Sequence, residues 1–345
     1  MSAYKVFIKD CLDLDGMAVA NTTCLSFSFS KDLLTSATSS FEVLDEIGNI
    51  KNGDILGLVD PYGTILYEGV VESFTAKTIQ CKELLSIFND NWLWHDPNEA
   101  TIEEAIENII NSDFVNSSDS LIASKFPFTV STTSTTTGTL EAQEANYVTN
   151  FESFLYGLYD QYGVIVDINI PFEASTPTIT IHTATSATLK IGNNMWSILN
   201  LTPLTEVVQI NKLSVYTTAG VLRDSYYCTV NGITNNDSDP LRLPVVKTKF
   251  IFDDSTPVAD LVAENLQQEI YNHRITFDLL LNNNLYEFTD WKLGQTLDIW
   301  YNSDYYSSIF TAYQMSKTQG NDVTTVSVTC GKVRNKLTEV LNGQK

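Results

Sequence analysis

The stretch that decides the fold is Lys51-Asn52-Gly53-Asp54-Ile55-Leu56-Gly57-Leu58. It has a counterpart near the other end of the chain, Lys292-Leu293-Gly294-Gln295-Thr296-Leu297-Asp298-Ile299. In each stretch a Gly follows a Lys by two positions and begins a run of apolar side chains that suits a β-strand. The two stretches therefore predict two strands of the same kind, one in each half of the chain.

The similarity between the two ends extends to five features in the same order. The spacing from Phe to Gly is 12 residues in the first copy and 17 in the second, and the spacing from Gly to Cys is 28 and 36. Two unrelated β segments would also share a Gly-turn-strand pattern, but the common order favours a repeated barrel-like module with loops of different length. The paired segments are 40–44 and 276–280, 51–58 and 292–299, 60–63 and 302–305, 75–78 and 316–318, and 80–83 and 329–332.

The rest of the chain carries signals for strands and for three helices. Leu25–Ser30 alternates apolar and polar residues, and residues 54–74 predict a hairpin around Asp60-Pro61-Tyr62-Gly63. The predicted helices are 102–110 after the capping box Thr101–Glu104, 150–162 ended by Gly163, and 256–270 with Thr256 as N-cap and Pro257 at the first position. Further strands are predicted at 164–170, at 178–182, within 207–252, and from 273 to about 330.

These signals predict an α+β fold that is mainly β, with two similar small β-barrels flanking an inserted α/β region. The predicted domains are a first barrel over 1–90 and an inserted α/β domain over 91–205. Strands and a helix over 206–272 would link that domain to a second barrel with a C-terminal tail over 273–345. A chain of 345 residues is long enough for several such cores.

The net charge of −22 limits the partners that this protein can have. It argues against gripping DNA through Lys and Arg clusters and against docking on an anionic membrane. Two interpretations stay open, a charge that only aids solubility and a surface or pore that repels phosphate. No apolar run is long enough for a transmembrane helix, the N-terminus lacks the pattern of a signal peptide, and five dispersed cysteines predict reduced thiols in a protein folded in a cytoplasm.

The titratable residues show no pattern that marks a catalytic or ligand-binding site. His95, His182 and His273 are far apart in the sequence, and neither a zinc motif nor a nucleotide-binding Gly loop is present. Glu103, Glu104 and Glu107 are expected on the solvated side of a helix, and the acidic loop Asn235–Asp239 could hold Ca²⁺ or form a solvated turn. We therefore expect no catalytic, cofactor-binding or metal-binding residue, no cofactor, and no enzymatic activity.

Two aromatic pairs and one basic cluster leave alternatives open. Trp92 and Trp94 are expected to flank a turn, and Tyr305 and Tyr306 to lie at a hairpin tip. Exposed rings there could bind a sugar or a partner protein, whereas core or interface packing would bury them. The basic cluster near the C-terminus could form a short helix against a neighbour or a solvated tail; its members are Lys332, Arg334, Lys336 and Lys345.

The end of the second module resembles a known family. Its last strand, Val326–Cys330, continues into Gly331, Arg334, Leu337 and Thr338, which fit a Gly-x-x-Arg-x-x-Leu-Thr pattern. This ending looks like the close of the structural N-terminal domain of phage tail-associated lysins. The order of barrel, inserted region and second barrel resembles the baseplate hub proteins of long-tailed phages over essentially the whole chain.

The resemblance implies a structural tail-tip protein of the virion, made in the cytoplasm of the bacterial host. It implies a homotrimer whose six barrels form a pseudo-sixfold ring that meets the hexameric distal tail or tail tube protein and closes or gates the DNA channel. The tape measure protein and receptor-binding proteins are further candidate partners, and DNA would pass through without specific binding. The chain stops about 15 residues after Cys330, so we expect no lytic domain. A carbohydrate-binding adhesion module and a cell-wall hydrolase are the alternative functions.

Overall fold

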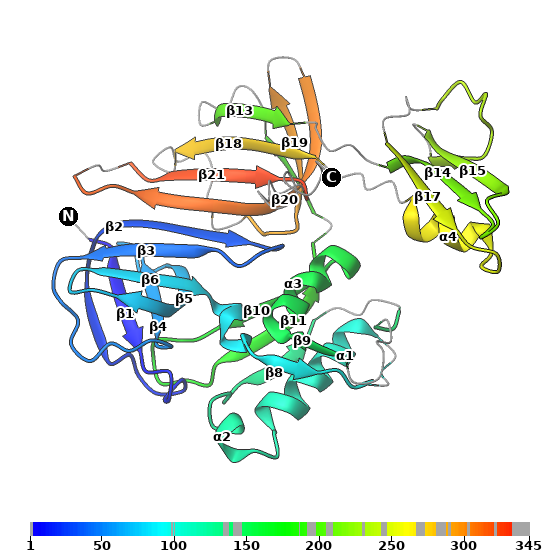
Figure 1. Ribbon diagram of the computed structural model, residues 1–345. Coiled ribbons are helices and arrows are strands. Elements are labelled where there is room, and N and C mark those ends of the chain that lie inside the picture. Colours follow the sequence, from blue (N-terminus) through cyan, green and yellow to red (C-terminus); the bar gives the residue numbers. More distant parts are fainter. Residues whose placement is uncertain are drawn as a thin grey trace. The chain divides into compact units, whose positions relative to one another are not determined.

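The chain forms two compact units. The first comprises Met1–Thr202 and Ile275–Cys330, and the second comprises Pro203–Arg274 and Gly331–Lys345. The computed structural model (Figure 1) describes residues 3–97, 99, 101–133, 138–140, 147–185, 187–191, 198–204, 210–229, 232–242, 247–266, 273–280, 288, 291–301, 304–320 and 323–332.

The first six strands of the first unit close into a β-barrel. Each strand pairs antiparallel with two others in the ring order β1-β4-β5-β6-β3-β2, and β2 returns to β1. Alternating residues of these strands point inward, and Phe29, Phe41 and Tyr67 are fully buried inside the ring. The strands are β1 (Lys5–Lys9), β2 (Ala20–Asp32), β3 (Thr38–Val43), β4 (Ile55–Val59), β5 (Ile65–Phe74) and β6 (Thr78–Glu83).

Six further strands of the first unit follow the same neighbour order. Their order is β12-β19-β20-β21-β18-β13, and β20 also pairs with β2, so both sets belong to one 12-stranded sheet. The match is incomplete at one strand, because β12 runs parallel to β19 whereas β1 runs antiparallel to β4. The strands are β12 (Thr188–Ile191), β13 (Ile198–Leu204), β18 (Arg274–Leu280), β19 (Thr296–Tyr301), β20 (Asp304–Lys317) and β21 (Thr325–Cys330).

Four strands of each set agree residue by residue, which confirms the predicted repeat. Phe41 pairs with Ile79 across β3 and β6, and Phe277 pairs with Val328 across β18 and β21. Cys81 and Cys330 lie two positions farther along their strands and are both fully buried. The irregularity in β5 between Val71 and Ser73 recurs in β20 between Phe310 and Ala312, also opposite the Cys. A bulge interrupts a ladder at one defined place, so its recurrence shows that the two sets share one register.

The inserted region has its own core of helices and short strands. Its three-stranded sheet has the order β10-β11-β8, and β7 pairs with β9 in a separate two-stranded sheet. Helix α1 packs against β8, and helix α3 packs against β10. The elements are a 3₁₀ helix (Leu84–Phe88), β7 (Asn91–Leu93), α1 (Ile102–Ile110), a π-helical turn (Asn111–Val115), α2 (Ser120–Ala123), β8 (Thr129–Thr132), β9 (Val148–Asn150), α3 (Phe151–Tyr162), β10 (Val164–Asn169) and β11 (Thr178–Thr183).

The ends of α1 and α3 lie where the sequence predicts them. Thr101 accepts the Glu104 amide at 3.3 Å, and Asn150 accepts the Ser153 amide at 3.0 Å. Gly163 ends α3 in the left-handed conformation with φ of 69°. These side chains and the Gly satisfy backbone groups that the helix cannot pair internally.

Two predictions about this region are wrong. Glu103 is fully buried rather than solvated, because it precedes the buried Ile106 and Ile110 by three and seven positions and shares their stripe on α1. Trp92 and Trp94 do not flank a turn, since Trp92 lies within strand β7, paired with Thr149 of β9.

The second unit is a four-stranded sheet with one helix on it. The sheet order is β16-β15-β14-β17, and its core contains Leu213, Val215 and Cys228 from the strands and Leu261 and Val262 from α4. The elements are β14 (Ile210–Tyr216), β15 (Leu222–Thr229), β16 (Gly232–Thr234), β17 (Lys247–Phe252) and α4 (Val258–Asn265).

Helix α4 begins one residue later than predicted. Pro257 is its N-cap residue, and Val258 is the first helical residue. Thr256 does not cap the helix, because its hydroxyl and amide both donate to the carboxylate of Asp253, at 2.9 and 2.6 Å. The predicted end of this helix, Ile270, lies outside the described residues.

The fold class predicted from the sequence, α+β and mainly β, is confirmed.

Candidate functional site at the junction of the two repeats

Strand β2 joins the barrel to the second set of strands. Its first half, Ala20–Thr23, pairs with β1 and closes the barrel, and its second half, Phe27–Asp32, pairs antiparallel with Ala312–Lys317 of β20. Because the two partners occupy successive segments of this 13-residue strand, one strand serves both pairings. The two repeats therefore meet edge to edge through backbone hydrogen bonds.

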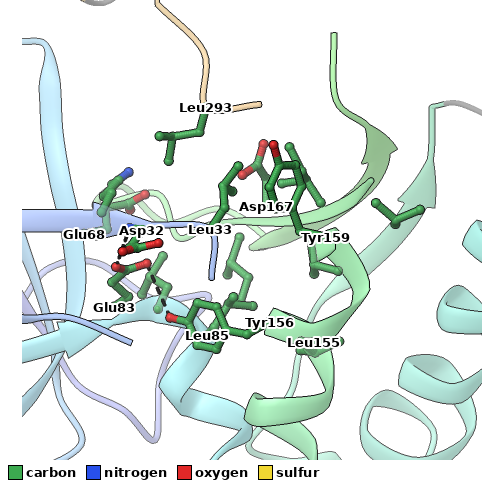
Figure 2. Close-up of a pocket in the computed structure, with 16 residues that line it drawn as sticks. Asp32, Leu33, Glu68, Glu83, Leu85, Leu155, Tyr156, Tyr159, Asp167 and Leu293 are labelled. Carbon is green, nitrogen blue, oxygen red and sulfur yellow. Dashed lines mark hydrogen bonds between the residues drawn. The ribbon is translucent and has the colours of Figure 1, made fainter. Parts of the chain in front are cut away.

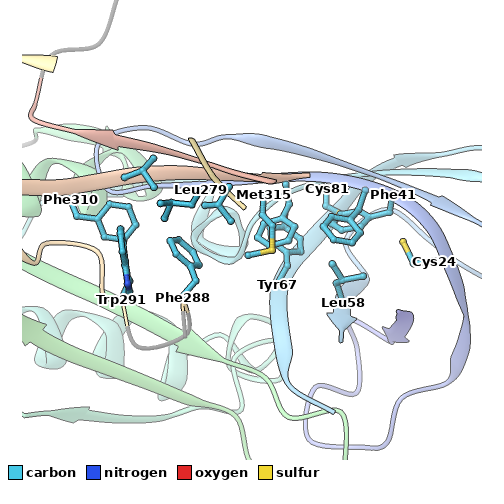
Figure 3. Packing of buried hydrophobic residues seen from close by; sticks show 14 of the residues in the cluster. Cys24, Phe41, Leu58, Tyr67, Cys81, Leu279, Phe288, Trp291, Phe310 and Met315 are labelled. Carbon is cyan, nitrogen blue, oxygen red and sulfur yellow. The ribbon is translucent and has the colours of Figure 1, made fainter. Parts of the chain in front are cut away.

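A single hydrophobic core spans this junction (Figure 3). Phe29 lies 5.0 Å from the Tyr67 ring inside the barrel and 6.2 Å from the Tyr313 ring of β20. On the other side, Tyr313 meets Phe288 edge to face at 5.0 Å, and Phe310 meets Trp291 at 5.9 Å. Aromatic pairs at these spacings contribute beyond their buried area, so the two repeats are held together by a core of the kind found within a domain.

A small cavity with both charged and apolar lining residues lies where β2 ends (Figure 2). It has a volume of about 90 Å³ and is lined from β2, β5 and β6, from α3 and β10 of the inserted region, and by Leu293. Small-molecule sites usually enclose about 300 Å³ or more, whereas one water occupies about 30 Å³. The cavity therefore suits a few waters rather than a sugar or a nucleotide.

Two carboxyl groups at this cavity have strongly raised pKa values. Burial raises the pKa of Glu83 to about 8, although the Asp32 amide donates to its Oε1 at 2.9 Å. Burial likewise raises the pKa of Glu68 to about 7, and the Ile170 amide donates to its Oε1 at 3.2 Å. Desolvation disfavours the charged form of a carboxyl group more than these single hydrogen bonds favour it.

Lys31 supplies the positive charge of the cluster. Burial opposes its charge, but Tyr313, Glu83, Glu68 and Asp167 together outweigh burial and raise the Lys31 pKa. Tyr156 completes the cluster, since its hydroxyl donates to Glu83 Oε2 at 3.4 Å. The cluster can bind and release protons near neutral pH. Its described residues bring no hydroxyl or thiol nucleophile next to an imidazole base, as nucleophilic catalysis would require.

The sequence does not reveal this cluster. Lys31 stands at the end of an alternating strand, and Glu68 and Glu83 lie in strands with ordinary spacing. Only the barrel closure and the packing of α3 bring the three side chains together. A charged residue inside a predicted strand, such as Glu68 between Tyr67 and Gly69, is the one signal in the sequence that could have indicated this cluster.

The histidines His95 and His182 lie at separate places in the structure. His95 Nε2 contacts Asp113 Oδ2 at 2.8 Å, and Ser112 donates to the other oxygen of Asp113 at 2.8 Å. In a catalytic triad the His stands between the other two groups, so this order does not activate the Ser. His182 Nε2 contacts Asp167 Oδ2 at 2.8 Å, which raises the His182 pKa.

The acidic groups that could hold a cation have partners within the protein. In the loop 235–239, Asn236 accepts the Ser238 amide and Asp239 accepts the Leu241 amide, which is the bonding of a turn. Asp10, Cys11 and Asp54 offer ligand atoms within 4.8 Å of one another. Lys51 contacts Asp10 at 2.9 Å, however, and the amides of Lys51 and Cys11 donate to Asp54, so that group is already occupied by donors.

The aromatic residues named from the sequence separate into buried and exposed pairs. Trp92 and Trp94 are buried in the core of the inserted region, which agrees with the packing interpretation. Tyr305 is exposed near the β19–β20 turn, and its ring lies 4.7 Å from the half-exposed ring of Trp300. Tyr306 is partly buried against the main core. In the basic cluster, Lys332 is described, and Arg334, Lys336 and Lys345 lie outside the described residues.

The second unit has an aromatic surface on the sheet face away from α4. Phe250 and Phe252 are 59% and 61% exposed, and Tyr216 stacks on Phe252 at 5.6 Å. Tyr227 on the same sheet lies under the guanidinium of Arg242 at 3.9 Å. No helix among the described residues is long and apolar enough to cross a membrane.

Comparison with solved structures identifies the class of fold. A chain of the P2 virion baseplate in its activated conformation matches with a TM-score of 0.54 and 12% identity over 96% of this chain and 100% of that one. A tail protein from Neisseria meningitidis MC58 matches with a TM-score of 0.55 and 10% identity over 96% and 97%. A prophage tail protein from Listeria monocytogenes EGD-e matches with a TM-score of 0.52 and 13% identity over 99% and 98%.

This chain therefore has the fold of phage baseplate and tail proteins, along almost its whole length. The resemblance predicted from the sequence is confirmed at the level of the fold. No family model matches the chain, and no curated protein matches it.

Proposed function

We propose that the protein is a structural hub of a phage baseplate or tail tip, located in the virion. The observation that carries this proposal is the repeated strand set. The β3–β6 and β18–β21 ladders share a register and a buried Cys, and the β5–β6 and β20–β21 ladders share a bulge. Two similar modules in one chain would let three chains present six similar modules around one axis. Such a trimer would match a hexameric distal tail or tail tube protein, since closed rings are the usual end of a repeated head-to-tail contact.

Each segment of the chain would then have its own role. In this proposal the segments 1–90 and 273–345 build the ring, the segment 91–205 closes or gates the channel, and the segment 206–272 connects and contacts partners. The tape measure protein and receptor-binding proteins are the partners we propose beyond the ring. The aromatic surface of Phe250 and Phe252 supports a contact in the 206–272 segment, because exposed rings of this size are typical of interfaces.

The acidic balance supports a role next to DNA without binding it. The net charge of −22 supports this role, because an acidic protein repels the phosphates of DNA. A negatively charged lumen would let DNA slide through, because it would offer no Lys or Arg side chains to neutralise the phosphates and displace the counterions of the DNA. Labelled duplex DNA should not be retained by the purified protein at 50 mM salt, and retention would contradict this part of the proposal.

Mass photometry with cryo-electron microscopy tests the hub. We expect particles of three times the 38.5 kDa chain, with six barrels around the axis, that bind a purified distal tail or tail tube hexamer. A protein that stays monomeric at micromolar concentration contradicts the hub. Clearing of cell walls in a zymogram would contradict the structural assignment in favour of a hydrolase.

One observation favours a second function, host carbohydrate binding. Trp300 and Tyr305 stack at 4.7 Å, and both are about half exposed, as sugar-binding rings are. Glycan binding that a Trp300→Ala, Tyr305→Ala variant loses would support this function. Unchanged binding, or none, would leave these rings as part of a protein interface.

A further inference from the structure

The sheet of the second unit has two edges of different length. Strand β16 forms one edge with three residues, and β17 forms the other with six (Figure 1). Among the described residues, β17 pairs only with β14. An edge strand presents amide and carbonyl groups with which a further strand can pair, and short edges are a common protection against such pairing. Strand β17 is therefore the edge of this sheet that is long enough to accept another strand.

The two sides of β17 differ in chemistry. Phe250 and Phe252 lie on the sheet face away from α4, and both rings are more than half exposed. Lys249 lies on the face of α4, where its Nζ donates to Asn265 Oδ1 at 2.6 Å, and its side chain is exposed as well. The edge thus offers an aromatic side and a cationic side to whatever pairs with it.

The exposed rings of β17 are held in place by a third ring. Tyr216 of β14 lies 5.6 Å from Phe252 and 6.2 Å from Phe250, measured between ring centroids. Rings that are already packed lose little side-chain freedom when a partner covers them. Side chains of an added strand would meet Phe250 and Phe252 as cross-strand neighbours.

The strands of this sheet are basic in an otherwise acidic chain. They contain four basic residues and one acidic residue, whereas the whole chain contains 20 and 42. The basic residues are Lys212, Arg223, Lys247 and Lys249, and the acidic one is Asp224. Arg223 pairs with Asp253 at 3.4 Å, but neither Lys212 nor Lys249 has a carboxylate within ion-pair distance among the described side chains. The sheet therefore favours a partner that carries negative charge.

We propose that β17 accepts an extended segment of a partner protein as a fifth strand, and that this segment alternates apolar and acidic side chains. Successive side chains of a strand point to opposite faces, so its apolar residues would contact Phe250 and Phe252 while its acidic residues lie on the side of Lys249. This inference rests on the partner contact proposed for the segment 206–272 and names the chemistry of that partner.

The charge of β17 argues against a second copy of the same strand as the occupant. Pairing β17 with its own copy would bring positive charge against positive charge, and Lys on an edge strand is a common device against such pairing. An acidic strand brings charges of opposite sign to the same edge. The charge therefore selects between the two occupants, as a repulsive element does in specific recognition.

Peptide binding to the full-length protein tests strand addition. The probes are fluorescein-labelled heptapeptides in which Glu alternates with Val, Ile or Phe, and the same peptides with Lys in place of Glu. At least one Glu peptide should bind with saturation, and its Lys counterpart should bind at least about 10-fold more weakly. No saturable binding of any Glu peptide up to about 1 mM overturns the proposal.

Substitutions on β17 test where the peptide binds. A Phe250→Ser, Phe252→Ser variant should weaken binding at least about 10-fold, and Lys249→Glu about 3- to 10-fold. The controls are Ile233→Ser on the opposite edge, where Ile233 is 40% exposed, and Lys125→Glu, which changes the net charge equally at an exposed site of the first unit. Neither control should change the affinity. Circular dichroism checks that each variant is folded, and binding that the β17 variants leave unchanged overturns the proposal.

Hydrogen exchange locates the added strand. A saturating Glu peptide should slow amide exchange in β17 and leave exchange in β16 unchanged, because only the edge that gains a strand gains backbone hydrogen bonds. Slower exchange confined to other segments overturns strand addition. Oligothymidylate that displaces the peptide at equal concentration would show a general polyanion surface and would overturn it too.

The outcomes separate this contact from the hub. Peptide binding does not require the ring, so a wild-type trimer that binds no Glu peptide overturns strand addition and leaves the hub standing. A monomer that binds the peptide through β17 overturns the hub and leaves strand addition standing. A trimer that dissociates when Phe250 and Phe252 are changed to Ser would place a second copy on this edge and overturn the acidic partner.

Discussion

Gly53 and Gly294 make the same backbone contact in the two halves of the chain. Their amides donate to Val71 and Phe310 at 2.8 and 2.7 Å, and their φ angles are 94° and 84°. Both angles lie in the left-handed region, where a residue with a Cβ is strained. Both positions therefore require Gly for the same reason of backbone geometry, just before β4 and β19 begin.

The surroundings of the two glycines differ, and this predicts different costs for one substitution. A Cβ on Gly53 would meet its nearest atom, Cys11 Sγ, at 3.7 Å, whereas a Cβ on Gly294 would lie 2.7 Å from Ala184 Cβ. Gly53→Ala should cost about 1 kcal/mol of unfolding free energy from the φ angle alone, and Gly294→Ala about 1–3 kcal/mol more from overpacking. Denaturant unfolding of both variants measures the difference, and equal losses would contradict the role assigned to Ala184.

Gly331 is the one residue of the C-terminal motif whose structure is described, and its conformation explains the Gly. Its φ is 88°, and a Cβ would lie 1.9 Å from the carbonyl oxygen of His273. Because that oxygen belongs to the backbone, it cannot swing away. Gly331→Ala should therefore lower the melting temperature by several degrees, with a cost of about 2–4 kcal/mol. Gly220→Ala, at a φ of 83° with open space around it, is the matched control and should cost only about 1 kcal/mol.

The raised pKa of Glu83 predicts a stability that falls as pH rises. The folded protein keeps a proton on Glu83 up to about pH 8, whereas the unfolded chain releases it near its ordinary pKa of 4.5. The folded state binds more protons in this window, so the free energy of unfolding decreases from about pH 4.5 to pH 8.

Glu83→Gln should remove much of this dependence. We expect wild type to lose roughly 2–3 kcal/mol more than the variant between pH 5 and pH 8, since Gln keeps an acceptor for Asp32 and carries no charge. Denaturant unfolding at a series of pH values measures the two slopes. A wild-type stability that rises over this range would contradict a buried, protonated Glu83.

The shared core predicts that the two repeats unfold together. Phe29→Ala should cost about 3–5 kcal/mol, because the ring is fully buried between Tyr67 and Tyr313. Hydrogen exchange should then accelerate in both β3 and β18. Leu213→Ala is the control, since Leu213 is fully buried in the core of the second unit, and its loss should accelerate exchange in β14 and β15. Faster exchange in β3 alone after Phe29→Ala would contradict a common core.

The burial of the cysteines predicts their reactivity. Burial raises the pKa of Cys24 to about 12, and it raises the pKa of Cys81 further, while Cys11 is only partly buried. A thiol reagent should modify Cys11 first and the others only on unfolding, because the thiolate is the reactive form. Early modification of Cys81 in the native protein would contradict the closed barrel around it.

Local patterns in the sequence predict the elements whose causes are themselves local. The caps Thr101, Asn150 and Gly163 act on backbone groups within a few residues, so the ends of α1 and α3 could be placed from the sequence. The repeat could also be found, because turn glycines and alternating strands leave a pattern in the order of residues. The prediction that Glu103 is solvated was wrong, because the buried stripe of α1 is wide enough to include Glu103 beside its apolar residues.

The sequence by itself determined the mainly β class and the repeated strand set, because both follow from short-range patterns of turn glycines and alternating residues. The tertiary structure alone decided how the repeats meet, because the pairing of Phe29 with Met315 joins residues nearly 300 positions apart and depends on the closure of the barrel. It also decided the polar cluster of Lys31, Glu68 and Glu83, whose side chains come from three separate strands. Burial then sets their pKa values, and burial is a property of the packed molecule rather than of any one segment.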